Sequence, residues 1–188
     1  MPSGSLVELI ATASTRHFNG TGYRAIDTRY HAIPLSVEGS RRKSGRFHTV
    51  REVDAIYPAL DPATSLYETG MLLRSDDRIT AVPSNPRTVF TIAVDLPRVL
   101  DLRDPVTRTH LGFDLEKLKA PWRRATPNAP TQQLGLAAFR GGIQGIAYPS
   151  VHNPTGANLV VFPSNLTVGD TGSLRVFDST GNFAHDLP

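Results

Sequence analysis

Cysteine is absent from the 188 residues of the chain, and its absence excludes several kinds of chemistry. Disulfide scaffolds, thiolate zinc sites and cysteine nucleophiles all require a thiol. Long apolar runs are also absent, since stretches such as 159–163 are far too short to span a bilayer. The interior must therefore be held together by packing, and we expect neither a disulfide scaffold nor a membrane protein.

A strong charge imbalance is lacking too. Lysine and arginine number 20 against 17 acidic residues, so the net charge is only +3, although the pI is about 9.5. Basic residues cluster within 41–46 and at Arg123 and Arg124, but neither cluster lies in a nucleic-acid-binding motif with stacking aromatic residues. Direct nucleic-acid binding is therefore not expected. A non-catalytic basic nucleic-acid-binding module is kept as the alternative from a different functional class.

The first ten residues, MPSGSLVELI, have neither a basic region nor an apolar core of the usual length. No secretory signal peptide is therefore expected, and the predicted location is the cytoplasm. The length favours one domain over residues 1–188, with a core at about 20–178 and peripheral ends.

Short elements of both kinds alternate along the chain, because the 15 glycines and 15 prolines are spread throughout it. The clearest is a helix from Pro62 to the breaker Gly70, with Asp61 placed to cap its free N–H groups. Trp122 is expected to anchor the core, and 95–98 to be a turn between two strands. The remaining predicted strands are 22–26, 55–60, 89–94, 99–102, 145–148, 158–162 and 174–177, the last three as a meander, and the remaining helices are 114–119 and 131–139. The pattern predicts a compact α+β domain.

Familiar catalytic motifs are missing. The sequence has no Walker A loop, no GxGxxG after a strand, no GxSxG and no HExxH. None of its six histidines shares a metal-ligand spacing with a partner and a third ligand nearby. We therefore expect no metal site.

Scattered segments nevertheless combine in a recognisable order. They are GYRAI at 22–26, LSVEGSRRKSGRF at 35–47, AIYPALDPATSLYE at 55–68, TQQLGLAAFRGGIQGIAYPS at 131–150 and NLVVFP at 158–163. In this order they resemble the RES-domain family, named for its Arg, Glu and Ser. The resemblance implies a fold similar to that of ADP-ribosyltransferases. It also implies an enzyme that cleaves or phosphorolyses NAD at the nicotinamide bond, or transfers ADP-ribose to a protein.

The resemblance implies roles for particular residues. Glu68 would be the catalytic carboxylate, because breaking an N-glycosidic bond passes through a cationic centre on the ribose that a carboxylate stabilises. Arg24 and Arg46 would bind the pyrophosphate of NAD, and Arg24 should meet an anion because it lies on an apolar strand. Tyr57 would stack on the nicotinamide or hydrogen-bond to the substrate, and Ser150 would contact its ribose. Arg24, Tyr57 and Glu68 form the predicted catalytic set.

This sequence departs from the family pattern at two places. Ala25 stands where many members have a bulky residue, so one wall of the pocket is more open or is filled by Tyr30 or His31. The usual GGRW followed by Asn is replaced by residues 44–48, SGRFH. His48 thereby replaces the Asn and leaves its hydrogen bond in question.

The predicted function is a toxin that depletes cellular NAD by cleaving the nicotinamide–ribose bond, as a glycohydrolase or phosphorylase. A mono-ADP-ribosyltransferase acting on a protein is the alternative, since water, phosphate and a protein side chain can all attack the same centre. No cofactor is expected: NAD is the substrate, and inorganic phosphate is an optional co-substrate. The expected protein partner is an antitoxin with an Xre-like helix-turn-helix domain, or an immunity protein.

Overall fold

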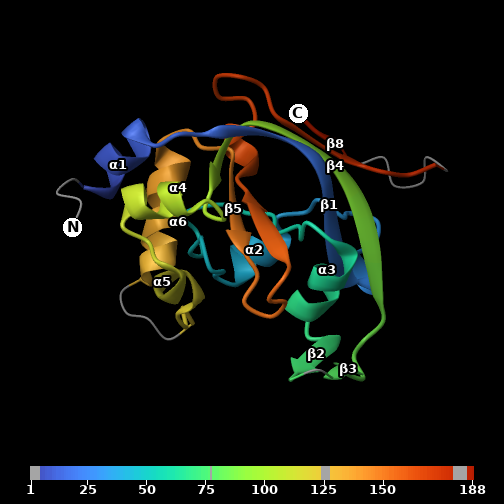
Figure 1. Cartoon of the computed structure of the whole chain (residues 1–188). Helices are drawn as coiled ribbons and strands as arrows, with labels where there is room; N and C mark the ends of the chain where they lie inside the picture. The colour runs from blue at the N-terminus through green and yellow to red at the C-terminus, as the bar shows by residue number, and fades with distance from the viewer. Residues whose placement is uncertain (1–4, 77, 124–127, 180–185) are drawn as a thin grey trace.

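Two long antiparallel strands organise the computed structural model, which describes residues 5–76, 78–123, 128–179 and 186–188 (Figure 1). Strand β1 (Arg16–Asp27) pairs with β4 (Arg87–Asp101) along almost its whole length. In β4 every second residue from Phe90 to Leu96 is buried, which is the period that places one face of a strand against a core. The strand predicted at 22–26 is therefore the end of a longer one.

The other edge of β4 is shared by two strands. β7 (Ser173–Val176) pairs with residues 92–95, while β5 (Gly145–Pro149) pairs in parallel with 99–101. β6 (Ala157–Val161) then pairs antiparallel with β5, and the short β8 (Asp186–Leu187) with β7. The last predicted strands therefore exist, but the expectation of a consecutive meander is wrong, because β7 joins β4 and not β6.

The predicted turn at 95–98 is also wrong, because β4 runs through it. Pro97 has no N–H to donate, which ordinarily excludes it from a central strand. Here it faces a register shift between Arg16 and Phe18 of β1, and on the other edge it falls between the residues paired with β7 and those paired with β5. No ladder hydrogen bond is needed at that position.

Segment 56–60 closes the sheet into a ring. Ala59 exchanges backbone hydrogen bonds with Tyr23 of β1 at 2.7 and 2.8 Å, and Ile56 exchanges two with Val161 of β6 at 2.8 and 2.9 Å. The backbone neighbours thus follow the order β1, β4, β5, β6, segment 56–60 and back to β1. The strand predicted at 55–60 is present as isolated bridges.

Four helices cluster at one end of the sheet (Figure 1). They are α1 (Leu6–Thr12), α4 (Pro105–Leu111), α5 (Leu115–Lys119) and α6 (Pro130–Arg140). Together with one side of β5 they enclose a core that includes Phe47, Leu134, Ile146 and Phe162. Helix α6 can approach closely because a Cβ at Gly135 would lie 1.9 Å from the carbonyl oxygen of Phe47. Residue 47 is thereby fixed against the helix.

The remaining elements are η1 (Thr28–Tyr30), α2 (Glu38–Arg42), α3 (Pro62–Glu68), the hairpin of β2 (Leu72–Ser75) and β3 (Arg78–Ala81), and η2 (Pro163–Asn165). Of these, η2 lies against the end of α6, where Asn165 donates to the carbonyl oxygen of Phe139. Within the described ranges, no helix has the length and apolar character to cross a membrane. The result is a mixed domain of sheets with interleaved helices, as the sequence predicts.

Candidate active site

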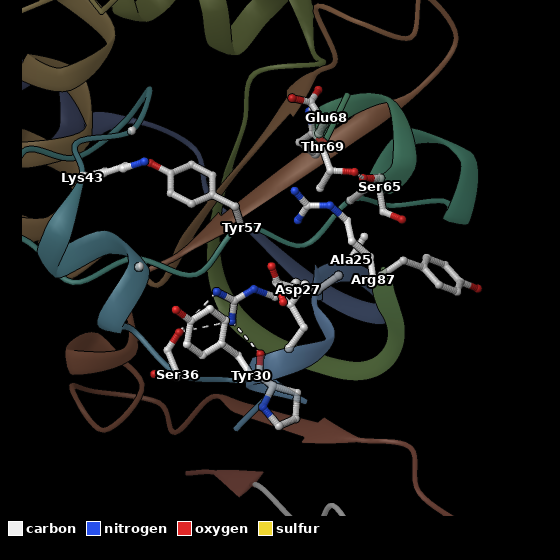
Figure 2. Close-up of a pocket in the computed structure, with 18 of the residues that line it drawn as sticks. Ala25, Asp27, Tyr30, Ser36, Lys43, Tyr57, Ser65, Glu68, Thr69 and Arg87 are labelled. Carbon is white, nitrogen blue, oxygen red and sulfur yellow. Dashed lines mark hydrogen bonds between the residues drawn. The ribbon is translucent and has the colours of Figure 1, made fainter. Parts of the chain in front are cut away.

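One open cavity of about 820 Å³ lies between β1, α2, α3 and the ring-closing segment. Its wall includes Arg24, Arg46, Tyr57 and Glu68, so four of the five predicted site residues line the same space. Figure 2 shows Tyr57 and Glu68 reaching this cavity from different elements. The structure therefore brings together residues that lie up to 44 positions apart.

Glu68 is placed by the capped helix α3. Asp61 accepts the N–H of Thr64 at 2.8 Å, and Pro62 occupies the first helical turn, as predicted. The side chain is solvent-exposed, but its Oε1 accepts hydrogen bonds from Ser150 Oγ and Asn158 Nδ2, each at 2.7 Å. These two donors fix the position of Oε1. Oε2 receives neither bond.

Ser150 lies behind Glu68, and only 3% of it is exposed. Its hydroxyl donates to Glu68 and accepts the backbone N–H groups of His152 and Asn153 at 3.1 and 3.0 Å. The hydroxyl proton is therefore committed to the carboxylate. Its position makes Ser150 a support for Glu68, and the contact with the substrate ribose stays a prediction.

Arg24 donates hydrogen bonds to backbone carbonyl oxygens, although a buried guanidinium is expected to pair with an anion. Its Nη1 donates to Pro34 at 2.6 Å, and its Nη1 and Nη2 donate to Ser36 at 3.3 and 3.2 Å. Loss of water around the buried group lowers the pKa of Arg24 to about 10, so it remains charged at neutral pH. Its charge is not neutralised by these partners.

Arg46 is fixed in the same way. Its Nη1 donates to the carbonyl oxygens of Leu118 and Ala120 at the end of α5, where carbonyls lack helical partners. Desolvation lowers the pKa of Arg46, while the nearby Tyr148, Glu68 and Tyr57 oppose this shift. Both predicted arginines are thus held by backbone oxygens at the cavity wall.

The Tyr57 hydroxyl belongs to a polar network with His48. Nε2 of His48 faces the carbonyl oxygens of Ser40 and Lys43 at 3.2 and 3.0 Å, so Nε2 must carry the proton. Nδ1 then accepts the hydroxyl proton of Tyr57 at 2.8 Å, and the same hydroxyl accepts the N–H of Phe47 at 3.1 Å. Burial raises the pKa of Tyr57 and keeps it neutral.

Comparison with known proteins places the chain in a family. The model of the RES domain matches residues 21–176, which is most of the sequence. The chain belongs to the RES-domain family. A comparison with curated protein sequences gives no significant match.

The RES domain also has a solved structural neighbour. The structure titled "Crystal structure of the M.tuberculosis MbcT-MbcA toxin-antitoxin complex" contains a chain that superposes with a TM-score of 0.63 at 22% identity. The match covers 97% of this chain and 91% of that one. The similarity confirms the mixed α+β fold.

Sequence reasoning missed several residues of this RES domain's cavity. Asn158 holds Glu68 and is almost fully buried, Arg87 lines the wall, and Tyr148 packs on Phe47 with ring centroids 4.7 Å apart. Asn158 begins the segment NLVVFP, so a polar residue at the start of an apolar strand was the available signal. Arg87 gave no signal, because it begins an ordinary strand.

Three further expectations concern the cavity. The sequence predicts Trp122 as a core anchor, but Trp122 is only partly buried and lines the cavity of the RES domain. Ala25 and Tyr30 both line the cavity, and the expectation that Tyr30 or His31 fills the wall at Ala25 stays a prediction. His48, which stands in the position of the usual Asn, makes a hydrogen bond of its own to Tyr57.

Cations outnumber carboxylates around the cavity. The described wall residues include three carboxylates, Asp27, Glu38 and Glu68, against six cations, Arg24, Arg42, Lys43, Arg46, Arg87 and Arg123. Asp27 is paired with Arg29, and Glu38 with Arg42. The site therefore favours an anionic ligand.

Two cations of the basic loop of the RES domain are paired with acids. Arg41 binds Asp54 through its Nε and Nη2 at 2.7 to 3.2 Å, and Arg42 lies 3.4 Å from Glu38. Arg124 lies outside the described residues. In the described parts of the chain, no cluster of three His, Asp or Glu side chains could hold a metal ion.

Proposed function

We propose that this RES domain cleaves the nicotinamide–ribose bond of NAD and acts as a toxin by depleting it. The observation that carries the proposal is the Glu68 carboxylate, held by Ser150 and Asn158 at the edge of a cationic cavity. A volume of about 820 Å³ is within the range of pockets that bind molecules of this size.

The chemistry needs only groups that the cavity supplies. When the bond between C1′ and the pyridinium nitrogen breaks, its electron pair moves to nitrogen and nicotinamide leaves as a neutral molecule. Positive charge then develops on the ribose, where the carboxylate of Glu68 stabilises it or orients the 2′-hydroxyl. Water or phosphate completes the reaction by attacking C1′ and losing a proton.

The binding of NAD follows from the same geometry. Arg24 and Arg46 remain charged and have backbone carbonyls, not carboxylates, as partners. They can therefore attract the pyrophosphate without first breaking an ion pair. Tyr57 presents its ring at the cavity while His48 and Phe47 hold its hydroxyl, which supports a stacking role.

A toxin of this kind must be restrained in the cell that makes it. The structural neighbour comes from a toxin–antitoxin complex, which supports a protein antitoxin for this chain as well. We propose an antitoxin with an Xre-like helix-turn-helix domain that blocks the cavity, with an immunity protein as the other form of partner.

The test is to incubate the purified protein with NAD, with and without phosphate, and to measure released nicotinamide by chromatography. Glu68→Gln keeps the shape but removes the charge, and should lower kcat by about 100-fold or more. Its melting temperature should stay close to that of the original protein. Absence of nicotinamide release in both buffers would remove the proposal.

The same reactions are repeated with lysate proteins added, and mass spectrometry of their small-molecule and protein products identifies which nucleophile accepts the ADP-ribose. Free ADP-ribose indicates water, ADP-ribose 1″-phosphate indicates phosphate, and an ADP-ribose adduct on a protein indicates mono-ADP-ribosyl transfer.

A further inference from the structure

Arg87 is a cation without an assigned partner at the start of β4. Its backbone pairs with Asp27 of β1, and its side chain lines the cavity. The Nε atom is buried and has no hydrogen-bond partner. An N–H group that has lost water without gaining an acceptor costs folding free energy, so such groups are uncommon unless something else binds them.

The neighbouring Asp27 makes no hydrogen bond with the guanidinium of Arg87. Its carboxylate instead accepts from Nε and Nη2 of Arg29 at 3.0 and 2.8 Å. Arg87 contributes only a through-space charge effect at Asp27, which is weaker than the bonds from Arg29. The guanidinium of Arg87 therefore keeps N–H donors that have no acceptor among the described residues.

The side chain points to where a ligand would lie. In Figure 2 the guanidinium of Arg87 extends into the cavity toward Ser65 and Thr69 of the α3 region. Glu68 lies on that same region and lines the same cavity. A ligand bound by Arg87 would thus extend to the catalytic carboxylate along one wall.

We propose that Arg87 binds the pyrophosphate of the dinucleotide through the fork of its guanidinium. This inference rests on the proposed function, because it assumes that a nucleotide with a diphosphate enters the cavity. Arg24 and Arg46 spend guanidinium N–H groups on backbone carbonyls, whereas the terminal N–H groups of Arg87, at the cavity wall, have no acceptor among the described residues and can join them in binding the diphosphate. A planar fork binds two phosphate oxygens at once.

Calorimetric titration of the full chain with three probes tests the assignment. They are ADP-ribose, inorganic pyrophosphate and adenosine, which has no phosphate. Arg87→Gln should weaken ADP-ribose and pyrophosphate roughly 10- to 100-fold, the loss expected for a charged hydrogen-bond pair, and leave adenosine unchanged. Arg74→Gln, the same change on the exposed strand β2, should change none of the three. Equal binding of ADP-ribose by the original protein and Arg87→Gln would overturn the assignment.

Two further variants separate ligand binding from a structural role. Arg87→Met removes the unpartnered N–H, so the free protein should melt at the same or a higher temperature while binding of ADP-ribose is lost. Arg87→Lys keeps the charge without the fork and should recover part of the affinity. If both variants melted well below the original protein and bound ADP-ribose normally, Arg87 would be a structural residue.

The binding assay does not require turnover, so the two proposals fail separately. Arg87-dependent binding of ADP-ribose without nicotinamide release would keep this inference and remove the proposed NAD cleavage. Nicotinamide release by Arg87→Gln with an unchanged KM for NAD would keep the cleavage and remove the inference.

Discussion

The carboxylate of Glu68 depends on two residues that follow it by more than 80 positions. Ser150 and Asn158 both donate to Oε1, so their side chains fix its orientation before any ligand arrives. The family pattern predicts Ser150 as a site residue. The contact of Asn158 with Glu68 could not be predicted in that way, because it depends on the register of β6 against segment 56–60. Residue types can suggest a site, but the hydrogen bonds that orient it come from long-range pairing.

Asn158→Asp tests whether the donor to Oε1 of Glu68 is required. Aspartate has nearly the shape of asparagine, but an ionised carboxylate cannot donate and its charge repels that of Glu68. The kcat for nicotinamide release should therefore fall by roughly tenfold or more. Asn158→Ala is the control, because it removes the donor without adding charge and should lose less. An unchanged kcat in Asn158→Asp would contradict the role of Asn158 in orienting Glu68.

His48 should make the stability of the protein depend on pH. Burial lowers the pKa of His48 below its usual value of 6.5, because the folded state disfavours the charged ring. Below about pH 6.5 the unfolded chain then binds more protons than the folded one, so the free energy of unfolding falls as the pH falls.

Urea denaturation at pH 7.5 and pH 5.5 measures this effect. His48→Gln should reduce the loss of stability between the two pH values, because it removes the ring whose pKa burial lowers. An identical loss in the original protein and in His48→Gln would contradict this account. The carboxyl of Asp27 does not contribute to this difference, because its hydrogen bonds with Arg29 lower its pKa to about 2. Protonation of Asp27 therefore affects stability only in strongly acidic solution.

At the scale of elements, short-range signals located several helices and strands but not the pairing between the strands. The cap at Asp61, the proline at Pro62 and the glycines after α6 act within a few residues, so the sequence predicted these helices correctly. Pro97 misled because its effect depends on neighbours: β4 tolerates it where β1 has a register shift and where β5 and β7 leave a gap. Strand pairing is a long-range property that local residue patterns do not contain.

Removing the cap of α3 should affect catalysis as well as stability. Asp61→Ala leaves the N–H of Thr64 without its acceptor and should cost about 1 kcal/mol. Because Glu68 ends this short helix, a small displacement should also lower kcat/KM by roughly tenfold or more.

Asp104→Ala is a matched control for that change. Asp104 caps α4, where its two oxygens accept from Val106 N and Thr107 Oγ1, and α4 does not border the cavity. It should cost similar stability, measured by urea denaturation, and leave kcat/KM unchanged. Equal activity losses in the two variants would show that the effect of Asp61 is general destabilisation.

At the scale of the whole molecule, the net charge of +3 gains meaning from its distribution. Six cations line the cavity wall against three carboxylates, although one of the six, Arg42, is paired with Glu38. The excess is too small to argue for a polyanion partner, but it suits one anionic nucleotide. Composition could predict the total charge, and only the fold could show where it lies.

Salt should therefore weaken substrate capture more than the chemical step. Raising the ionic strength screens the cavity charges, so the KM for NAD should rise between 50 and 500 mM NaCl while kcat changes little. Initial rates across this range, with Na₂SO₄ at equal ionic strength as a control for chloride, provide the measurement. A KM that does not depend on salt would show that the cavity charges do not attract the substrate.

The closed ring of strands also sets when the site comes into being during protein synthesis. Arg24, Arg46, Tyr57 and Glu68 leave the ribosome first, and Ser150 and Asn158 follow Glu68 by more than 80 residues. Until β5 and β6 have emerged and joined β4 and segment 56–60, the carboxylate lacks the donors that orient it. A ribosome that stops before residue 150 releases a fragment with most of the cavity residues and no assembled centre. The architecture thus delays assembly of the candidate site until β6 has been synthesised.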